Sequence, residues 1–386
     1  MRKNTLVLAL SALFYTVTST HDRHAIVAAA EADGIDLNIL PFASVALDSI
    51  EALQTPVVIP AALQNSTRID VHSHVVPSWF RTLVPVTGGT PTPNWTVEAH
   101  FALMASLKIR RSIAMISAPG STAFAGDSAK SIALARLLNE YLAALSRVYP
   151  DYFSFYATVP LPYTNAAITE ANYALNSLNA SAIGLFSNYE SLYLGNLLFT
   201  PFFQSINTRT NTSTSSILFV HPNAPCLRLA DNTLIPANPT LYLTGTVEFY
   251  FETARTFMDL SLSRTLVNFT NLNWIVPHAG GSFPSIISRS LTTTSEVIRN
   301  GNFDAYRRRL WWDTAGPTFP FQVQGLLGYN ISKERIVYGT DFPYIPVPNN
   351  AAYVASTQGI ENATFLSGEE KHGIFSGNAR KLFGLA

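Results

Sequence analysis

The sequence has one cysteine, few charged residues and no net charge. Because Cys226 is the single cysteine of 386 residues, no intramolecular disulfide can form and the fold must be held by its hydrophobic core. We expect Cys226 to be a small buried residue. Lysine and arginine total 25, as do aspartate and glutamate, and charged residues make up 13% of the chain. This balance gives no electrostatic reason to expect nucleic acid or an anionic membrane as a partner.

Long apolar runs are missing beyond the first residues. Thr5–Val17 is apolar, follows Arg2 and Lys3, and is too short to span a bilayer comfortably. We interpret residues 1–20 as a secretory signal peptide, with a signal anchor as the alternative. No stable membrane span would remain after cleavage.

Seven N-x-S/T sequons support this secretory route. Together with the signal peptide they predict a glycoprotein that is secreted or retained in a vesicle or vacuole. The seven candidate glycosylation sites are Asn65, Asn94, Asn179, Asn211, Asn268, Asn330 and Asn362.

The rest of the chain divides at residue 68. Residues 21–67 are interpreted as an N-terminal extension without assigned chemistry, and residues 68–386 as one domain. In that domain, short β-rich apolar runs alternate with helical stretches such as residues 128–149, and the eight runs start about 38 residues apart. This alternation predicts an α/β fold, a (β/α)8 TIM barrel. The expected strands are residues 69–72, 112–117, 153–159, 182–186, 216–221, 272–278, 310–313 and 336–341.

Two loops are longer than the repeat requires, residues 75–95 and residues 222–246. Both follow the carboxyl end of an expected strand, where barrel enzymes build their pockets. We interpret them as lids or dimer contacts.

Histidine and aspartate side chains gather at the ends of these strands. His72 and His74 lie two residues apart on the first strand, so their side chains point to the same face. His221 ends the fifth strand, His278 the sixth and Asp341 the eighth. The imidazoles of His72, His74 and His221 with the carboxylate of Asp341 would suit one Zn²⁺, with Mn²⁺ or Fe²⁺ also possible. His278 follows a proline and has no near partner, which favours a base or proton donor beside the metal.

The other four histidines are assigned no chemistry. We interpret His21 and His24 as solvated, and His100 and His372 as structural residues of helices.

The site residues resemble the amidohydrolase superfamily, in the branch typified by aminocarboxymuconate semialdehyde decarboxylase. The resemblance covers residues 68–386 and is carried by DVHSH at 70–74, VHP at 220–222, HAGGSFP at 278–284 and GTDFP at 339–343. It implies a distorted, amidohydrolase-type (β/α)8 barrel and a catalytic proton-transfer role for His278. The implied metal ligands are His72, His74, His221 and Asp341.

The same resemblance implies a partner and a substrate contact. In this branch, an arginine eleven residues after the catalytic histidine meets a substrate carboxylate, often across a dimer interface. That position is Arg289 here, so a homodimer is implied.

One feature of many superfamily members is absent. Binuclear hydrolytic members usually carry a carboxylated lysine at the end of the fourth strand, whereas residues 184–187 read GLFS, with no lysine near them. A mononuclear site is therefore favoured.

Residues 95–98, 117–120 and 338–344 are similar to fungal 6-methylsalicylate decarboxylases of polyketide pathways.

These observations favour non-oxidative decarboxylation of a small ortho-hydroxy aromatic acid. The leading substrate is 6-methylsalicylate, which would become 3-methylphenol in polyketide secondary metabolism. The ring carbon that carries the carboxylate must be protonated before CO2 leaves, and either His278 or Asp341 would supply the proton. Arg289, Trp95 and Phe283 are the candidate substrate contacts. The candidates for an aromatic pocket wall, with core packing as the alternative for each, are Trp79, Phe80, Trp95 and Phe283.

Two other functions remain open. A mononuclear metal-dependent hydrolase of a lactone or amide would use the same ligands. A non-catalytic secreted barrel is the third reading, and the presence of all five site residues argues against it. The product separates the first two, because only a decarboxylase releases CO2.

Overall fold

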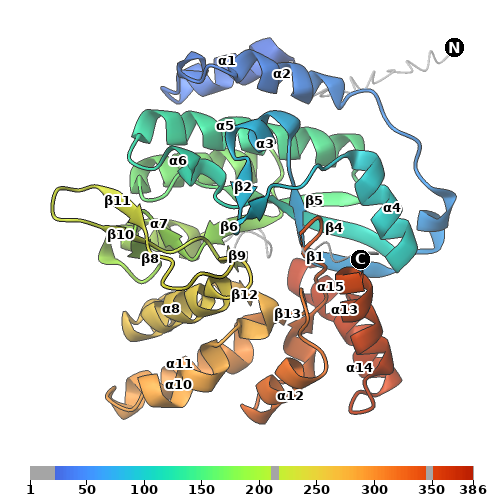
Figure 1. Ribbon diagram of the computed structural model, residues 1–386, viewed down its shortest axis with the longest axis vertical. Helices are drawn as coiled ribbons and strands as arrows, with labels where there is room; N and C mark the ends of the chain where they lie inside the picture. The colour runs from blue at the N-terminus through green and yellow to red at the C-terminus, as the bar shows by residue number, and fades with distance from the viewer. Residues whose placement is uncertain (1–21, 210–216, 345–350, 386) are drawn as a thin grey trace, which may run out of the picture.

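The protein folds as a barrel of parallel strands surrounded by helices (Figure 1). The computed structural model describes residues 22–209, 217–344 and 351–385. The predicted signal peptide 1–20, His21 and Asn211 lie outside the described residues.

Eight strands form one parallel sheet in chain order, as the sequence predicts. The central strands are buried along their whole length, which is typical of parallel strands covered on both faces. The strands are β1 (Arg68–Val75), β4 (Ile109–Ile116), β5 (Phe153–Thr158), β6 (Ala182–Phe186), β9 (Ile217–His221), β12 (Asn273–Val276), β13 (Leu310–Asp313) and β14 (Ile336–Val337).

The barrel closes between its last and first strands, although β14 has only two residues. The chain that follows β14 continues along β1, where Val71 N donates to Tyr338 O at 2.9 Å and His74 N donates to Phe342 O at 2.6 Å. The regular strand β14, Ile336–Val337, is therefore shorter than the predicted strand 336–341. Its second half still pairs with β1, which brings Asp341 beside the histidines of that strand.

Helices follow most of the strands. The longest, α5, carries apolar residues at helical spacing and begins after Asp127, whose side chain accepts a hydrogen bond from Lys130 N. The helices are α1 (Arg23–Ala32), α2 (Ala43–Ala52), α3 (Ser78–Leu83), α4 (Val97–Leu107), α5 (Ser128–Val148), α6 (Thr164–Asn176), α7 (Thr200–Asn207), α8 (Glu248–Leu262), α9 (Thr265–Asn268), α10 (Phe283–Ser290), α11 (Glu296–Arg308), α12 (Phe321–Gly328), α13 (Ala351–Asn362), α14 (Gly368–His372) and α15 (Asn378–Phe383).

The N-terminal extension packs on the outside of the barrel. Figure 1 shows α1 and α2 lying across α5. The buried guanidinium of Arg136 on α5 joins Asp33, at the end of α1, to Glu170 on α6, with N to O distances of 2.6 and 2.9 Å. This ion pair network ties the extension to the helical layer of the barrel.

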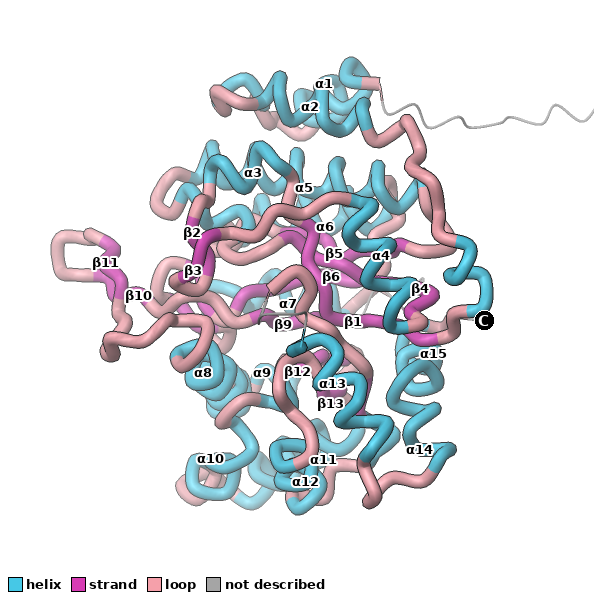
Figure 2. The backbone as a smooth tube through the Cα atoms, turned by 45° about the vertical axis from the view of Figure 1, so that its right-hand side comes forward, coloured by secondary structure: helices cyan, strands magenta, loops and turns pink. Residues whose placement is uncertain are grey.

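The two long loops contain short hairpins and meet near the mouth of the barrel (Figure 2). The first holds β2 (Val86–Thr87) and β3 (Thr90–Pro91), and the second holds β10 (Cys226–Arg228) and β11 (Leu234–Pro236). Gly245 N donates to Gly88 O at 2.8 Å, which joins the two loops. A third hairpin, β7 (Asn188–Tyr189) with β8 (Leu192–Tyr193), follows β6.

Cys226 differs from its prediction. It is only partly buried, because it lies on the β10–β11 hairpin rather than on a strand of the barrel. The thiol is free, as expected for a single cysteine.

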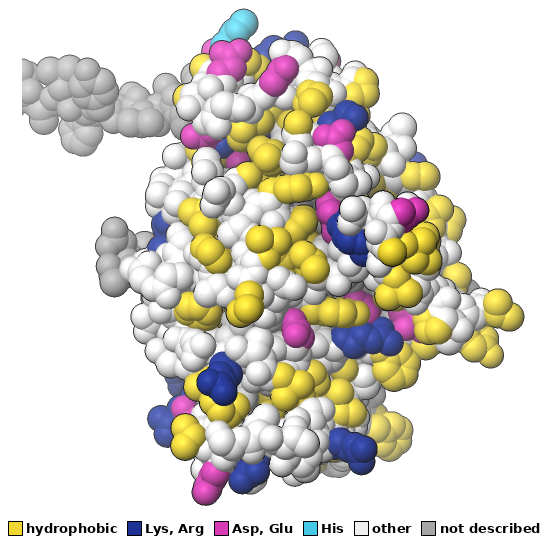
Figure 3. Space-filling model, turned by 90° about the vertical axis from the view of Figure 1, so that its left-hand side faces the viewer, with side chains coloured by type: hydrophobic (Ala, Val, Ile, Leu, Met, Phe, Trp, Pro, Cys, Tyr) yellow, Lys and Arg dark blue, Asp and Glu magenta, His cyan; other side chains and the backbone are white. Residues whose placement is uncertain are grey.

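The described surface has no strongly charged face in the view of Figure 3, where lysine, arginine, aspartate and glutamate are scattered among uncharged side chains. None of the described helices combines the length and hydrophobicity that crossing a bilayer requires.

Candidate active site

Four side chains that could bind a metal converge at the carboxyl ends of the strands. His72 and His74 lie on β1, and His221 is the last residue of β9. Asp341 lies in the segment that follows β14. All four are buried, and one ligand atom from each lies within 4.8 Å of the others. Within the described ranges this is the one such group, and it consists of the four predicted ligands.

The donor atoms are arranged around a common centre. The ring centroids of the three histidines lie 4.7 to 5.3 Å apart. Asp341 Oδ1 lies 3.3 Å from His72 Nε2 and 3.1 Å from His74 Nε2. In the described part of the chain, His72 Nε2, His74 Nδ1 and His221 Nδ1 are buried without a hydrogen-bond partner. Because buried polar atoms need partners, this mixed nitrogen and oxygen set fits a divalent cation such as Zn²⁺ or Mn²⁺.

The electrostatics of the cluster favour a bound cation. Burial disfavours a charged His72, but the carboxylates of Asp313 and Asp341 outweigh it and raise the pKa of His72 to about 10. Burial lowers the pKa of His74 and of His221, which keeps both rings neutral, as metal ligands must be. Burial alone would raise the pKa of Asp341, yet its histidine neighbours hold that pKa well below its usual value. The negative potential that favours a proton on His72 would equally favour a metal ion.

Asp313 is a site residue that the sequence analysis missed. It ends β13, and its Oδ2 accepts a hydrogen bond from His72 Nδ1 at 2.7 Å. This contact leaves His72 Nε2 for a metal and fixes the ring plane, as carboxylates behind metal-binding histidines commonly do. Asp313 Oδ1 also accepts from the backbone N of His278 at 2.8 Å. A carboxylate at the end of a buried strand was the signal that could have identified it.

Asp70 connects β1 to the segment that carries Asp341. Its carboxylate accepts hydrogen bonds from Thr340 Oγ1 at 2.6 Å and from the backbone N of Thr340 and of His72, both at 3.1 Å. Burial raises the pKa of Asp70 to about 7. Asp70 therefore helps to position two candidate ligands, His72 and Asp341, and is not itself a member of the group that could hold a metal.

His278 lies beside the cluster in a strained turn. It follows β12 directly after Pro277, and its Nε2 lies 3.4 Å from Asp341 Oδ2. His278, Ala279, Gly280 and Gly281 all have positive φ angles, of 52°, 50°, 90° and 55°. Gln322 on α12 donates from Nε2 to the carbonyl oxygens of His278 and Gly281. The surrounding hydrogen bonds therefore hold a conformation that the chain would otherwise avoid, a pattern typical of functional sites.

Replacing Gly280 by alanine is expected to destabilise this turn. A Cβ atom there would lie 2.6 Å from the ring of Trp312 and 3.0 Å from Pro284, at a φ of +90° that L-residues disfavour. Backbone strain and overpacking together should lower the free energy of unfolding by about 2–5 kcal/mol, measured by urea denaturation. The control is Gly126→Ala, with a φ of +84° and no atom near its Cβ, which should cost only about 1–2 kcal/mol. Equal losses in the two variants would contradict the packing argument.

Among the described residues, none of the three predicted substrate contacts forms a hydrogen bond, ion pair or ring contact with a candidate metal ligand. Trp95 is buried, and its Nε1 donates to His100 Nδ1 at 3.1 Å. Phe283 is buried against Phe257 and Trp312, within the packing of α8, α10 and β13. Arg289 is exposed on α10, and its side chain has no partner in the described ranges. Their roles at the substrate remain predictions.

Different aromatic side chains lie next to the site histidines. Tyr344 contacts His74 edge to face at 5.1 Å, Phe249 lies 6.0 Å from His221, and Tyr250 stacks on His278 at 5.7 Å between ring centroids. Two other candidates for the wall pack elsewhere: Trp79 stacks on Phe42 of the extension, and Phe80 is fully buried beside it. The aromatic neighbours of the site histidines are thus residues other than the predicted ones, and the aromatic wall stays a prediction.

The end of β6 has no lysine, as noted from the sequence. Ser187 follows the last residue of β6, and its Oγ accepts a hydrogen bond from Asn223 N at 2.9 Å and lies 3.4 Å from Glu252 Oε2. This site therefore provides no bridging carboxylated lysine for a second metal.

The remaining described histidines lie outside the cluster. His100 is buried on α4 and has its pKa lowered to about 3 by burial, whereas His24 and His372 are exposed. These positions agree with a structural His100 and a solvated His24.

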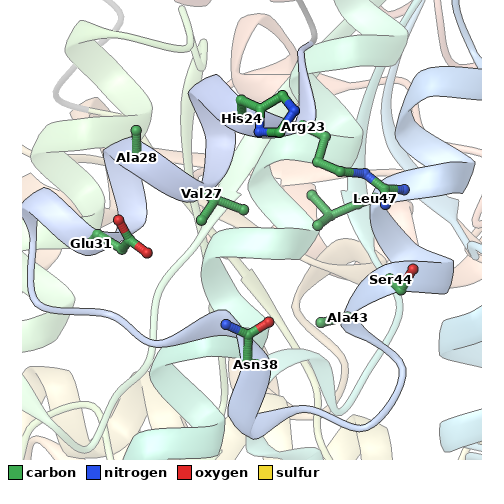
Figure 4. Close-up of a pocket in the computed structure, with 9 residues that line it drawn as sticks. All are labelled: Arg23, His24, Val27, Ala28, Glu31, Asn38, Ala43, Ser44 and Leu47. Atoms are coloured by element: carbon green, nitrogen blue, oxygen red, sulfur yellow. The ribbon is translucent and has the colours of Figure 1, made fainter.

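A separate hollow lies on the N-terminal extension (Figure 4). It opens between α1 and α2, on the far side of α5 from the strands, and Arg23 at its edge is already paired with Asp48 and Glu51. It holds no group of potential metal ligands, and we assign it no function. Its lining consists of Arg23, His24, Val27, Ala28, Glu31, Asn38, Ala43, Ser44 and Leu47.

The chain is similar to known proteins over most of its length. A family model described as amidohydrolase matches residues 69–385. The decarboxylase yanB of Aspergillus niger is 33% identical over 331 residues, which cover 82% of this chain and 87% of the relative. The 6-methylsalicylic acid decarboxylase of Penicillium expansum is 30% identical over 328 residues, which cover 82% of this chain and 96% of the relative.

A solved structure shows the same fold. The dihydroxybenzoic acid decarboxylase of Polaromonas sp., with bound manganese, superposes with a TM-score of 0.65 and covers 83% of this chain and 97% of its own. At 22% identity this likeness shows the barrel alone.

Proposed function

This chain belongs to the amidohydrolase family, and we propose that it is a metal-dependent decarboxylase of a small ortho-hydroxy aromatic acid. The best candidate reaction converts 6-methylsalicylate to 3-methylphenol and CO2 in polyketide secondary metabolism. The observation that carries the proposal is the contact of His278 Nε2 with Asp341 Oδ2, 3.4 Å apart, at the edge of a four-ligand cluster. The relatives at 30–33% identity, which are named decarboxylases, support the reaction class.

The proposed metal is one divalent ion, Zn²⁺ first and Mn²⁺ second. When bound by His72, His74, His221 and Asp341, it would supply a Lewis acid for the phenolate and carboxylate oxygens of the substrate. Because the Polaromonas decarboxylase binds manganese, both Zn²⁺ and Mn²⁺ are candidates for this chain.

The chain's own residues supply the proton. Decarboxylation needs a proton on the ring carbon that carries the carboxylate, after which the carbon–carbon bond breaks, CO2 leaves and the ring regains its aromaticity. His278 and Asp341 are close enough to share that proton, and either could deliver it. Both are almost fully buried, which limits competition from water. The donor then recovers a proton from solvent, so the enzyme ends unchanged.

A metal-dependent hydrolase of a lactone or amide is the competing function, because it could use the same ligands. The aromatic side chains around the histidines favour an aromatic substrate but do not identify the bond that breaks. The experiment must therefore measure the product.

The test is metal analysis of the purified protein combined with CO2 release from a panel of hydroxybenzoates. We expect about one equivalent of Zn²⁺ or Mn²⁺, release of CO2 from 6-methylsalicylate, and none from 2-methylbenzoate, which lacks the ortho hydroxyl. A chelator should abolish turnover, and adding back each metal separately should show which one restores it. Ring opening of a lactone without any CO2 release from the panel would favour the hydrolase instead.

A homodimer is part of the proposal. Arg289 is exposed on α10 and cannot be assigned to the site of its own chain, so it could reach a substrate carboxylate bound to a second copy. The long loop that follows β9, residues 222–246, exposes Leu241, Tyr242 and Leu243. Exposed apolar side chains that cluster in this way are common in protein interfaces. Light scattering measures the mass, and a monomer that retains full activity would exclude this role of Arg289.

We further propose that the protein enters the secretory pathway, and is secreted or kept in a vesicle or vacuole. All six described sequon asparagines are exposed, as glycan attachment requires. They are Asn65, Asn94, Asn179, Asn268, Asn330 and Asn362. A mass unchanged by endoglycosidase treatment of the protein from its native host would contradict glycosylation.

A further inference from the structure

The ring of Tyr250 lies parallel to the imidazole of His278. Their centroids are 5.7 Å apart and their planes differ by 18°. Tyr250 belongs to the first turn of α8, directly after the long loop that follows β9, and α8 lies beside β9 and β12 (Figure 1). The imidazole of His278 also lies 5.0 Å from that of His72 between centroids, in a tilted arrangement. It therefore contacts both a candidate metal ligand and a tyrosine.

The backbone fixes this stacking. The carbonyl oxygen of Tyr250 accepts hydrogen bonds from Ser282 N at 3.2 Å and from Ser282 Oγ at 3.1 Å. A Cβ atom on Gly281 would lie 2.7 Å from that same oxygen, so α8 approaches the turn as closely as a glycine allows. Tyr250 and the His278 turn thus form one packed unit from two different parts of the chain.

The hydroxyl of Tyr250 forms no hydrogen bond within the described part of the chain, unlike those of Tyr344 and Tyr156. Tyr344 donates to Ser117 Oγ at 2.7 Å, and Tyr156 donates to Val71 O at 2.8 Å. For Tyr250, the described residues offer no hydrogen-bond partner, and its side chain is only partly buried. Burial, with a smaller contribution from Asp341 and Asp313, raises the pKa of Tyr250 to about 12. The phenol therefore stays protonated and can donate a hydrogen bond.

We propose that Tyr250 is a further residue of the site, with a ring that positions His278 and a hydroxyl that donates to an oxygen atom of the substrate. The inference rests on the proposed function for the identity of that substrate, a phenol bearing a carboxylate. A fixed imidazole plane keeps the proton donor aligned with the ring carbon, which is a requirement for efficient transfer. A hydrogen bond from a neutral donor to an anionic oxygen adds affinity.

Two substitutions separate the two roles. Tyr250→Phe keeps the stacked ring and removes the hydroxyl, so KM should rise about tenfold while kcat changes less than about threefold. Tyr250→Leu removes the ring as well, and kcat should also fall by about 10- to 100-fold because His278 is no longer held. The matched control is Phe251→Leu, the next residue of α8, whose side chain is 47% exposed and which should leave both constants unchanged.

Binding and structure provide readouts that do not depend on turnover. We expect Tyr250→Phe to weaken binding of 3-methyl-2-nitrophenol to the metal-loaded protein about tenfold, followed by the absorbance of the nitrophenolate. An unchanged KM and an unchanged affinity for this probe would overturn the role of the hydroxyl.

The ring is tested by the crystal structure of Tyr250→Leu. A His278 imidazole that loses its single orientation supports the inference, and one that keeps its orientation together with an unchanged kcat overturns it. If the unaltered protein releases no CO2 from any hydroxybenzoate, the proposed function fails, but the orientation of His278 in this variant still decides whether Tyr250 positions it.

Discussion

Replacing His278 by alanine is expected to lower kcat for CO2 release by about 10²- to 10⁴-fold while leaving the metal content unchanged. General acid–base catalysis contributes a factor of this size, and His278 is the buried titratable group beside Asp341 that is not itself in the ligand set. Measuring initial rates at saturating substrate, with metal analysis of the same preparation, tests both parts of the expectation.

The control for this variant addresses the strained turn. Gln322→Ala removes the hydrogen bonds to the carbonyl oxygens of His278 and Gly281 but keeps the imidazole. Gln322→Ala should lower kcat by about 10-fold, which is less than the loss expected for His278→Ala. If His278→Ala turned over every substrate at the normal rate, Asp341 alone would have to deliver the proton and our assignment of His278 would be wrong.

Replacing His221 by alanine is expected to abolish metal binding and, with it, activity. His221 ends β9, is neutral because burial lowers its pKa, and offers a buried nitrogen with no other partner among the described residues. Removing a residue that only orients a ligand costs about 10- to 100-fold in metal affinity, so removing a ligand should cost at least about 100-fold. Competition with a chromogenic chelator measures this affinity directly.

His100→Gln is the matched control, because His100 is also a buried histidine but lies outside the cluster, against Trp95. That variant is expected to lose some stability and to keep one metal per chain. Normal metal content in His221→Ala would show that the remaining three ligands suffice. Loss of metal in both variants would point to unfolding, which circular dichroism detects.

The eightfold alternation of strands and helices was predictable from the sequence because parallel strands buried on both faces are apolar along their length. Seven of the eight expected runs match regular strands to within about three residues at each end. The last one does not, because only Ile336–Val337 forms a regular ladder with β13. The rest of that segment is held by backbone hydrogen bonds to β1, which no local pattern encodes.

The metal ligands were predictable for a related reason. Side chains at the carboxyl ends of barrel strands meet at one edge, so histidines at those positions converge whatever the loops do. Asp313 obeys the same rule and was overlooked because it stands alone in the sequence. The aromatic neighbours follow no such rule: Tyr344 and Tyr250 lie beyond the strands, and their distance from the histidines depends on how loops and α8 pack.

The sequence by itself thus determined the barrel and the four candidate ligands, because these depend on strand periodicity and on the residue at the end of each strand. Its motifs carried the resemblance to the family. Only the tertiary structure decided that Asp313 orients His72, that four consecutive positive φ angles present His278, and that Tyr250 rather than Phe283 lies against it. These relations join residues from separate elements, and their distances follow from packing across the barrel rather than from spacing along the chain.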